Sequence, residues 1–207
     1  GNISVDDANL LSATTTGIVT ASITTTERVS ELTTLTETTN AYTIVIPSAD
    51  AAVSASDLNT INSATTVAVD ITNVTSLTSS SLVDLGTLST AIENNEFLDD
   101  SGITTFDSTI AVSDTTIDAT TLASTIDKYD FLNGLNTTLM TLPSGATINI
   151  DASEIATILG HETGSIVGGS RLTISDQNIV VTGNISVDDA NLLSATTTGI
   201  VTASITT

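Results

Sequence analysis

The chain has 207 residues, with 24 acidic residues against three cations (Arg28, Lys128 and Arg171), a formal charge of −21 and no cysteine. Three cations cannot neutralise a run of phosphates, which excludes a nucleic-acid groove, and the lack of cysteine excludes a disulfide scaffold or a thiolate metal site. An apolar content of 40% argues against disorder. The longest strongly apolar stretches, such as Tyr42–Ile46, are far short of the roughly 18 residues that a membrane span needs.

Helical segments recur along the chain, each with a hydroxyl or acidic start followed by apolar residues three or four positions apart. This spacing places the apolar side chains on one stripe of a short helix, and Ser, Thr or Asp before the stripe accepts hydrogen bonds from the first free N–H groups. Asp and Glu there also meet the positive end of the helix dipole. The pattern predicts helices that start near residues 6, 26, 55, 80, 118, 152 and 188.

Short β-branched runs follow the helical segments, after Thr, Gly or Asn residues that mark turns. Alternating apolar positions, as in Val67, Val69 and Ile71, indicate strands with one buried face. Threonine suits the other face because it is both polar and β-branched. The longer intervals between helices leave room for two strands. The predicted strands are Ile18–Ile23, Tyr42–Ile46, Val67–Ile71, Thr109–Val112, Thr147–Ile150, Leu172–Ile174 and Ile179–Val181.

The two ends of the chain share one sequence. Gly1–Thr25 and Gly183–Thr207 are identical at all 25 positions, at an offset of 182 residues. Residues 1–182 are therefore interpreted as one complete tandem repeat unit, and residues 183–207 as the start of the next unit. No signal peptide is visible and the chain opens in mid-pattern, so we expect a window on a longer array. The alternative is an engineered duplication of one end.

Strand, turn and short helix, repeated at intervals of roughly 20 to 40 residues, are typical of a solenoid. We predict an α/β repeat solenoid with right-handed coils, in which short parallel strands alternate with short helices and roughly six or seven coils form each 182-residue unit. Only five residues are aromatic, which suits a narrow core of aliphatic ladders. A compact α/β domain repeated in tandem is the alternative, because such domains also alternate strand and helix.

Three segments carry a resemblance to a known class of proteins, namely Val5–Gly17, Ser54–Ile61 and Val67–Thr78. They resemble the repeats of giant, Thr/Ala/Asp-rich tandem-repeat cell-surface proteins of marine and filamentous cyanobacteria, of the filament, adhesin or sheath type. The resemblance implies an extracellular structural, adhesive or motility-associated role, and it supplies no functional residues. The Gly-Gly-x-Gly-x-Asp repeat of calcium-binding RTX arrays is absent, since Gly168-Gly169-Ser170-Arg171 lacks the aspartate.

Catalytic chemistry has little support, so we predict that the protein is not an enzyme and name no catalytic or cofactor-binding residue. The one histidine, His161, follows Gly160 near a helix end, where we expect it to cap the helix or to be solvated. The acidic pairs Asp6-Asp7 and Asp99-Asp100 are adjacent in sequence, which is not the geometry that a glycosidase needs. We expect Asp6-Asp7 to open a helix instead.

No cofactor is required by the sequence, and Ca²⁺ is the one that it leaves open. Calcium takes about six to eight oxygen ligands, and the candidates are Asp99 and Asp100, with Asp107 and Asp114 downstream. A solvated acidic turn is the plainer interpretation. Because Asp188 and Asp189 repeat Asp6 and Asp7, the 182-residue unit carries a formal charge of −19. Stacked at the parallel-strand spacing of about 4.8 Å, its coils would approach the charge density of duplex DNA, so we expect divalent cations to associate with it.

Uniform repetition without a localised aromatic or cationic cluster favours a structural role. We predict a structural repeat of a giant extracellular filament, sheath or surface-layer protein, located at the cell surface and self-associating end to end. Its expected partners are further copies of itself and divalent cations, with neither nucleic acid nor membrane insertion. An adhesin stalk or a ligand-binding module of a large surface protein is the alternative.

Overall fold

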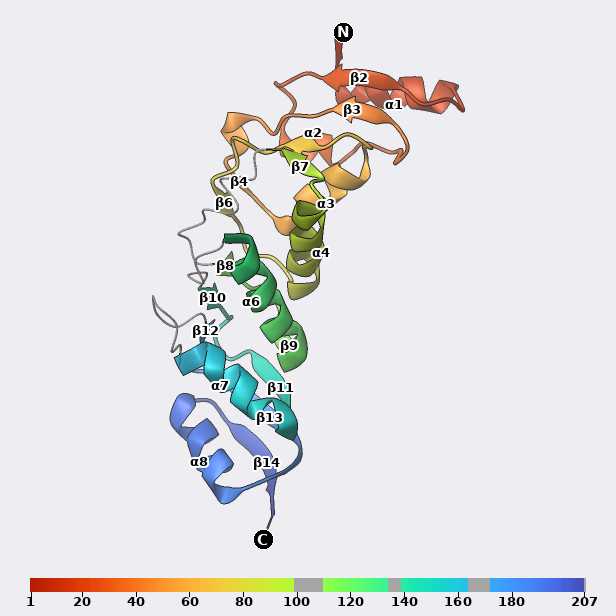
Figure 1. The fold of residues 1–207 in the computed structure, drawn as a ribbon. Helices are drawn as coiled ribbons and strands as arrows, with labels where there is room; N and C mark the ends of the chain where they lie inside the picture. The colour runs from red at the N-terminus through yellow and green to blue at the C-terminus, as the bar shows by residue number, and fades with distance from the viewer. Residues whose placement is uncertain (99–109, 134–138, 164–171, 207) are drawn as a thin grey trace. The chain divides into compact units, whose positions relative to one another are not determined.

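The structure is a computed structural model that describes residues 1–98, 110–133, 139–163 and 172–206. Within these ranges short parallel strands alternate with helices, the strands form several small parallel sheets, and no closed sheet is seen (Figure 1). The described residues divide into two compact units. Residues 1–78 and 84–98 belong to the first unit, and residues 79–83 and 110–206 belong to the second.

The first unit contains three small parallel sheets in its described part. β1, β2 and β3 pair in chain order, β4 pairs with β6, and β5 pairs with β7. A helix lies between β1 and β2 and between β2 and β3, whereas a helix and another strand lie between β4 and β6 and between β5 and β7. The elements are β1 (Asn2–Ile3), α1 (Val5–Thr14), β2 (Thr20–Ile23), α2 (Val29–Leu32), β3 (Ala41–Thr43), a 3₁₀ turn (Ser48–Asp50), β4 (Ala52–Val53), α3 (Ala55–Ser63), β5 (Val69–Asp70), β6 (Ser76–Leu77), α4 (Leu82–Glu93, which starts at the boundary between the units) and β7 (Phe97–Leu98).

The second unit is more regular and has two parallel sheets in its described part, ordered β12-β10-β8 and β14-β13-β11-β9. Three times in succession the chain adds one strand to the first sheet, one strand to the second sheet and then a helix, and β14 then extends the second sheet. The elements are β8 (Ile110–Ala111), β9 (Thr116–Asp118), α6 (Ala119–Asn133), β10 (Met140–Thr141), β11 (Thr147–Asp151), a 3₁₀ turn (Ala152–Glu154), α7 (Ile155–Thr163), β12 (Leu172–Thr173), β13 (Asn178–Ile185), α8 (Val187–Thr196) and β14 (Val201–Ile205).

Aliphatic ladders form the core of the second unit. Ile117, Ile148 and Ile179 lie in register on β9, β11 and β13, and all three are buried. A second ladder joins buried side chains of β8, β10 and β12, namely Ile110, Met140 and Leu172. Each side chain lies in register with its counterpart on the neighbouring strand, and burying an aliphatic side chain of this size contributes roughly 1.5–3 kcal/mol. No single strand could bury this surface without its neighbours.

Polar side chains fix where several helices begin, as the sequence predicted. The hydroxyl of Ser54 accepts a hydrogen bond from the N–H of Asp57 at 3.0 Å at the start of α3. At the start of α6, the Asp118 carboxylate accepts from the N–H of Thr121 at 2.9 Å. These short side chains satisfy N–H groups that the first turn of a helix leaves unpaired.

All seven predicted helix starts are followed by a helix, and the observed first residues are 5, 29, 55, 82, 119, 155 and 187. The largest differences are of three residues, and one is at α2, a single turn that ends at Leu32. Five of the seven predicted strands are shorter in the structure, as where the run Tyr42–Ile46 gives β3 only at Ala41–Thr43. The other two are longer: β11 extends to Asp151, and β13 covers Asn178–Ile185 instead of Ile179–Val181. The expectation of two strands in the longer intervals is confirmed. The sequence did not predict β1, β4, β6, β7, β9 and β10, because two or three residues are too few to show alternation. It also did not predict β14, although its residues repeat those of β2.

Candidate functional site

The two identical segments fold into the same elements. Gly1–Thr25, called the N-terminal copy below, contains α1, and Gly183–Thr207, called the C-terminal copy, contains α8 at the same positions. In each copy a serine caps the helix by accepting from the backbone N–H three residues ahead. The strand pairs also agree, with Asn2↔Ser22 and Ile3↔Ile23 in one copy and Asn184↔Ser204 and Ile185↔Ile205 in the other.

The N-terminal copy is held by the residues that follow it, 27–43, which are called the acceptor segment from here on. The N–H of Ala41 donates to the carbonyl of Val19 at 2.9 Å. The side-chain oxygen of Asn40 accepts from the N–H of Val19 at 2.8 Å. β3 then continues the sheet, with Thr20 opposite Ala41. The acceptor segment therefore pairs with one edge of β2 in a fixed register.

Tyr42 anchors the acceptor segment to α1. Its ring is buried, and its hydroxyl lies 3.3 Å from both the carbonyl oxygen of Ala8 and the hydroxyl of Ser12. The side-chain amide of Asn9 donates to the carbonyl of Thr34 at 3.0 Å. A buried aromatic ring whose hydroxyl finds partners combines apolar area with a directional contact, so this face of α1 is specifically covered.

The C-terminal copy is held through other groups by the residues that precede it, 175–182, called the upstream segment from here on. The hydroxyl of Thr197 donates to the carbonyl of Gln177 at 2.6 Å. The N–H of Ile200 donates to the side-chain oxygen of Asn178 at 2.9 Å. β14 pairs with β13, and in the described part of the chain it has no second strand beside it.

Burial separates the two faces of the repeated segment. Val5 is 3% exposed and its equivalent Val187 is 57% exposed, whereas Leu11 is 45% exposed and its equivalent Leu193 is fully buried. Ala8, Ser12 and Ile23 follow Val5 in being more buried in the N-terminal copy, and the equivalents of Ile3 and Thr15 follow Leu193 in being more buried in the C-terminal copy. Since the two sequences are identical, neighbours outside each copy cause these differences.

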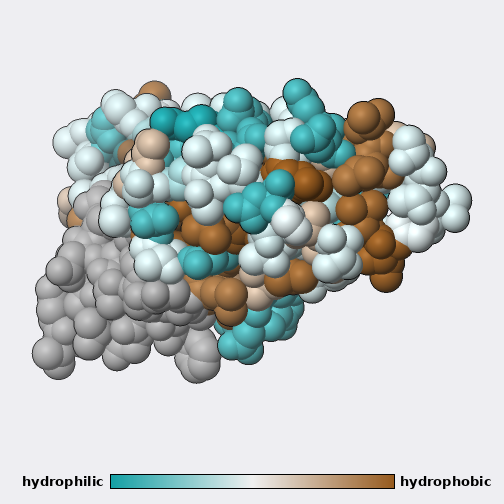
Figure 2. Space-filling view, turned by 90° about the horizontal axis from the view of Figure 1, so that it is seen from above, coloured by the Kyte–Doolittle hydropathy of each residue, from teal (hydrophilic) through white to brown (hydrophobic). Residues whose placement is uncertain are grey.

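A glycine shows the same asymmetry. A Cβ atom on Gly199 would lie 2.2 Å from the carbonyl oxygen of Gln177, so only glycine fits beneath the upstream segment. On the equivalent Gly17, the closest atom to a Cβ would be the hydroxyl of Thr15 at 3.5 Å, an ordinary contact. Gly17 meets no such backbone in the described structure, whereas Gly199 does. Figure 2 shows the side on which α1 and β2 are drawn in Figure 1, and apolar residues are visible at the surface in that view.

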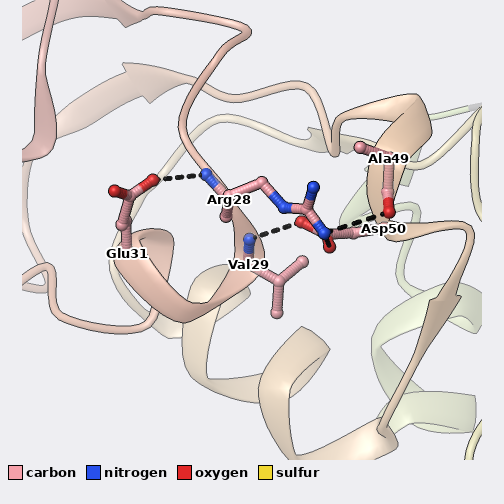
Figure 3. Close-up of polar contacts among 5 residues, drawn as sticks. All are labelled: Arg28, Val29, Glu31, Ala49 and Asp50. Atoms are coloured by element: carbon pink, nitrogen blue, oxygen red, sulfur yellow. Dashed lines mark hydrogen bonds and ion pairs between the residues drawn. The ribbon is translucent and has the colours of Figure 1, made fainter.

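The acceptor segment begins in a polar cluster that ties it to the next coil (Figure 3). The Arg28 guanidinium contacts the Asp50 carboxylate at 2.5 Å and the Ala49 carbonyl at 3.1 Å. The other Asp50 oxygen accepts from the N–H of Val29 at 2.8 Å, and Glu31 accepts from the N–H of Arg28 at 2.7 Å. The Arg28 side chain is half exposed, so the ion pair adds little by itself. The ion pair instead helps to hold the cluster in place, and the cluster caps α2 and fixes the start of the acceptor segment.

Glu27 connects this cluster to α1. Its carboxylate accepts from the N–H of Val5 at 3.3 Å. Burial raises the pKa of Glu27, and the negative charges of Glu31 and Asp6 raise it further against the lowering effect of the Val5 hydrogen bond. The raised pKa follows from the place of Glu27 in the contact between α1 and the acceptor segment, near the carboxylates of Glu31 and Asp6.

The predicted calcium candidates Asp99, Asp100 and Asp107 lie outside the described residues. Asp114 is described, and its carboxylate accepts from the N–H of Leu82 at 2.7 Å, so it caps the start of α4. The described ranges contain no group of three or more His, Cys, Asp or Glu side chains placed to hold a metal ion.

His161 is buried in the last turn of α7, which corrects the expectation that it is solvated, although its position near the helix end is as expected. Its Nε2 lies 3.7 Å from the Asp127 carboxylate of α6. Asp6 and Asp7 lie exposed in the first turn of α1, as predicted.

Pockets in the first unit are lined by polar side chains that already pair with one another. One cavity of about 300 Å³ is lined by residues that include Asn62, Thr65 and Glu96, and Asn62 donates to Glu96 at 2.6 Å. Another, of about 450 Å³, adjoins the paired Arg28 and Asp50.

No described helix is long and apolar enough to cross a membrane.

Sequence reasoning did not single out the residues that matter most at this site, Tyr42, Asn40 and Glu27. Each binds a backbone or side-chain group more than 20 positions away. The signal that could have located them is the 25-residue identity, because it marks the segment that these residues contact.

In the comparisons with known proteins, no protein-family model, curated protein or solved structure matches the chain.

Proposed function

We propose that this chain is a structural repeat of an extracellular filament, sheath or surface-layer protein, built as an open-ended α/β solenoid and not as an enzyme. In this proposal the coils are right-handed, as crossovers between parallel strands almost always are. One 182-residue unit then contributes the strand, turn and helix coils seen in the two compact units, and the next unit continues the same stack. The extracellular location rests on the resemblance of its repeats to giant cell-surface proteins.

One observation carries the proposal: the two copies are covered on complementary faces. The N-terminal copy is covered by the acceptor segment, and the C-terminal copy is covered by the upstream segment. A copy inside a continuing array would have both neighbours at once, and every position that is buried in either copy would then be buried. Gly17 supports this interpretation, because the demand for glycine at that position appears only beneath an upstream segment.

Charge gives the array a further property. A formal charge of −19 per 182 residues is distributed over a stack of about six strand spacings, or roughly 29 Å, which is close to the linear charge density of duplex DNA. Divalent cations are then expected to condense on the array and to reduce repulsion between neighbouring filaments. An adhesin stalk would share this architecture, whereas a ligand-binding module would need a defined ligand site.

Chains that contain two, three and four complete units test the proposal by small-angle X-ray scattering. Each added unit should lengthen the particle by about 30 Å, the rise expected from strand spacing, without a break in the cross-section. A string of separate globules, with distinct maxima in the distance distribution, would contradict it. The same series measured with and without CaCl₂ separates folding of the units from bundling of the filaments.

A further inference from the structure

We propose that the C-terminal copy of one chain takes the place of the N-terminal copy in a second copy of this chain, docking its exposed face on that chain's acceptor segment. The inference rests on the proposed function and names the surface and the partner for end-to-end association. The two copies have the same sequence. Each group that the acceptor segment contacts in the N-terminal copy is therefore present in the C-terminal copy, at the same position of the same local fold.

The contacts transfer one for one. In the N-terminal copy, the Tyr42 hydroxyl lies against Ala8 and Ser12, and these positions are Ala190 and Ser194 in the C-terminal copy. The remaining contacts involve the Val19 backbone and the Asn9 side chain, whose equivalents are Val201 and Asn191. An incoming β3 would pair with β14 in the register that it now has with β2.

The face of the C-terminal copy that would dock, called the donor face from here on, carries Val187, Ala190 and Ile205. In the 207-residue chain it is exposed and already ordered. Val187 and Ile205 are 57% and 42% exposed although their equivalents are buried, and β14 has an edge without a neighbouring strand in the described part of the chain. Meanwhile Leu193 and Thr197 hold the C-terminal copy to its own chain. Docking therefore needs no unfolding of the donor, and a preorganised surface loses less entropy on binding.

The two attachments do not compete for the same side chains. The upstream segment uses the positions of Leu193 and Thr197, whereas the acceptor segment uses the positions of Val187, Ala190 and Ile205. One copy can therefore be bound by its own chain on one side and by a second chain on the other. Exchange of an identical element between chains is a low-cost route to association, and repetition of the same head-to-tail contact builds an open polymer.

The N-terminal copy of the accepting chain opposes the exchange, because it is tethered beside the acceptor segment at an effective concentration of about a millimolar. Exchange breaks and remakes the same contacts. The equilibrium between monomer and polymer therefore depends on the protein concentration and on how tightly the tethered N-terminal copy is bound. Repulsion between chains that each carry −21 also opposes exchange, and salt screens it. A substitution that weakens only the N-terminal copy should therefore produce polymers.

Val5→Asp is that substitution, since it places a carboxylate in a buried position beside Glu27. In about 0.5 M NaCl, where charge repulsion is screened, sedimentation should shift from the 21.0 kDa monomer to dimers and larger species as concentration rises. Val187→Asp is the matched control, because it makes the same change in the same sequence context on the donor face. It should remain monomeric.

The double variant Val5→Asp/Val187→Asp identifies the surface that carries the association. It should be monomeric, because the donor face now bears a carboxylate as well. Polymers of equal size in the double variant would overturn the proposal, since association would then arise from exposed apolar surface in general. A folded, monomeric Val5→Asp chain would also overturn it.

Cross-linking of the natural surfaces decides the question if Val5→Asp fails to fold. The chain has no cysteine, so a Thr202→Cys chain mixed with an Ala41→Cys chain can form one defined disulfide between strands that would be paired. Oxidation at high concentration should give this heterodimer in excess over a control mixture of Thr202→Cys with Thr60→Cys, an exposed position on α3. Equal yields would overturn the proposal. If exchange fails while chains of several units still lengthen by constant steps, the array is covalent only and the proposed function stands.

Discussion

Val5 and Val187 have the same neighbours in sequence and different neighbours in space. Val5 packs under the acceptor segment and Val187 faces solvent, although the helices that carry them have the same bounds and the same serine cap. Leu11 and Leu193 differ in the opposite direction. The comparison separates two contributions that are usually mixed: local sequence sets the helix, the cap and the strand register, and the adjoining coils decide which side chains become core.

Leu193→Ala and Leu11→Ala should give the largest difference between the copies. Removing the fully buried Leu193 side chain should lower the free energy of unfolding by about 3–4 kcal/mol, because a cavity remains where the upstream residues packed. Leu11→Ala should cost less than about 1 kcal/mol, since that side chain is already half exposed. Urea unfolding followed by circular dichroism measures both. Equal losses would mean that the upstream residues do not cover Leu193.

Ile23→Ala and Ile205→Ala test the other face, and the order of the copies should reverse. Ile23 lies beside the acceptor segment and is buried, so its truncation should cost about 2–3 kcal/mol. Ile205 is partly exposed, and its truncation should cost less than about 1 kcal/mol. The same unfolding measurement applies. A larger loss for Ile205→Ala would contradict the assignment of the two faces.

Helix starts could be predicted from the sequence because each depends on a few adjacent residues, as with Ser54 and the N–H of Asp57. The shortest strands could not, since β4 and β6 have two residues each and exist through pairing with distant partners. The two copies of the identical 25-residue sequence fold alike, with a helix at equivalent positions and the same serine cap. The identity could not predict that Val5 is buried and Val187 exposed, because that difference lies entirely in the neighbouring coils.

Gly199→Ala and Gly17→Ala sharpen the comparison at the backbone. The Cβ on residue 199 would overlap the Gln177 carbonyl, so the upstream segment must move, at a cost of about 2 kcal/mol. Gly17→Ala should be neutral to within about 0.5 kcal/mol, because the added methyl group meets only an ordinary contact and the residue is exposed. Thermal unfolding compares the pair, and a loss of similar size for Gly17→Ala would show that the glycine is needed for local geometry rather than for close approach.

Glu27→Gln should give the smallest change in the free energy of unfolding. The change concerns the N-terminal copy alone, because the Glu27 carboxylate contacts the Val5 N–H. Because burial raises the pKa of Glu27 in the folded protein, the protonated form is favoured there, and stability from this group is lost as the pH rises through the raised value. Glutamine keeps an acceptor for the Val5 N–H without the charge. We expect a gain of less than about 1 kcal/mol at pH 7 and a flatter dependence on pH between about 7 and 4.

Glu93→Gln, an exposed substitution on α4 with the same charge change, is the control for that measurement. It should leave the pH dependence unchanged apart from the general effect of one less negative charge. A pH profile altered equally by both substitutions would mean that net charge, rather than the contact of Glu27 with α1, explains the result.

Thiol labelling in a longer chain tests most directly whether the exposed face of the C-terminal copy is the surface on which the next unit continues. At low protein concentration, Val187→Cys should react quickly with a maleimide in the 207-residue chain, and Val5→Cys should react slowly. When the chain is extended by one complete 182-residue unit, Val187→Cys should become as slow as Val5→Cys, because a second acceptor segment then covers it. Unchanged, rapid labelling of Val187→Cys in the extended chain would contradict a continuous stack.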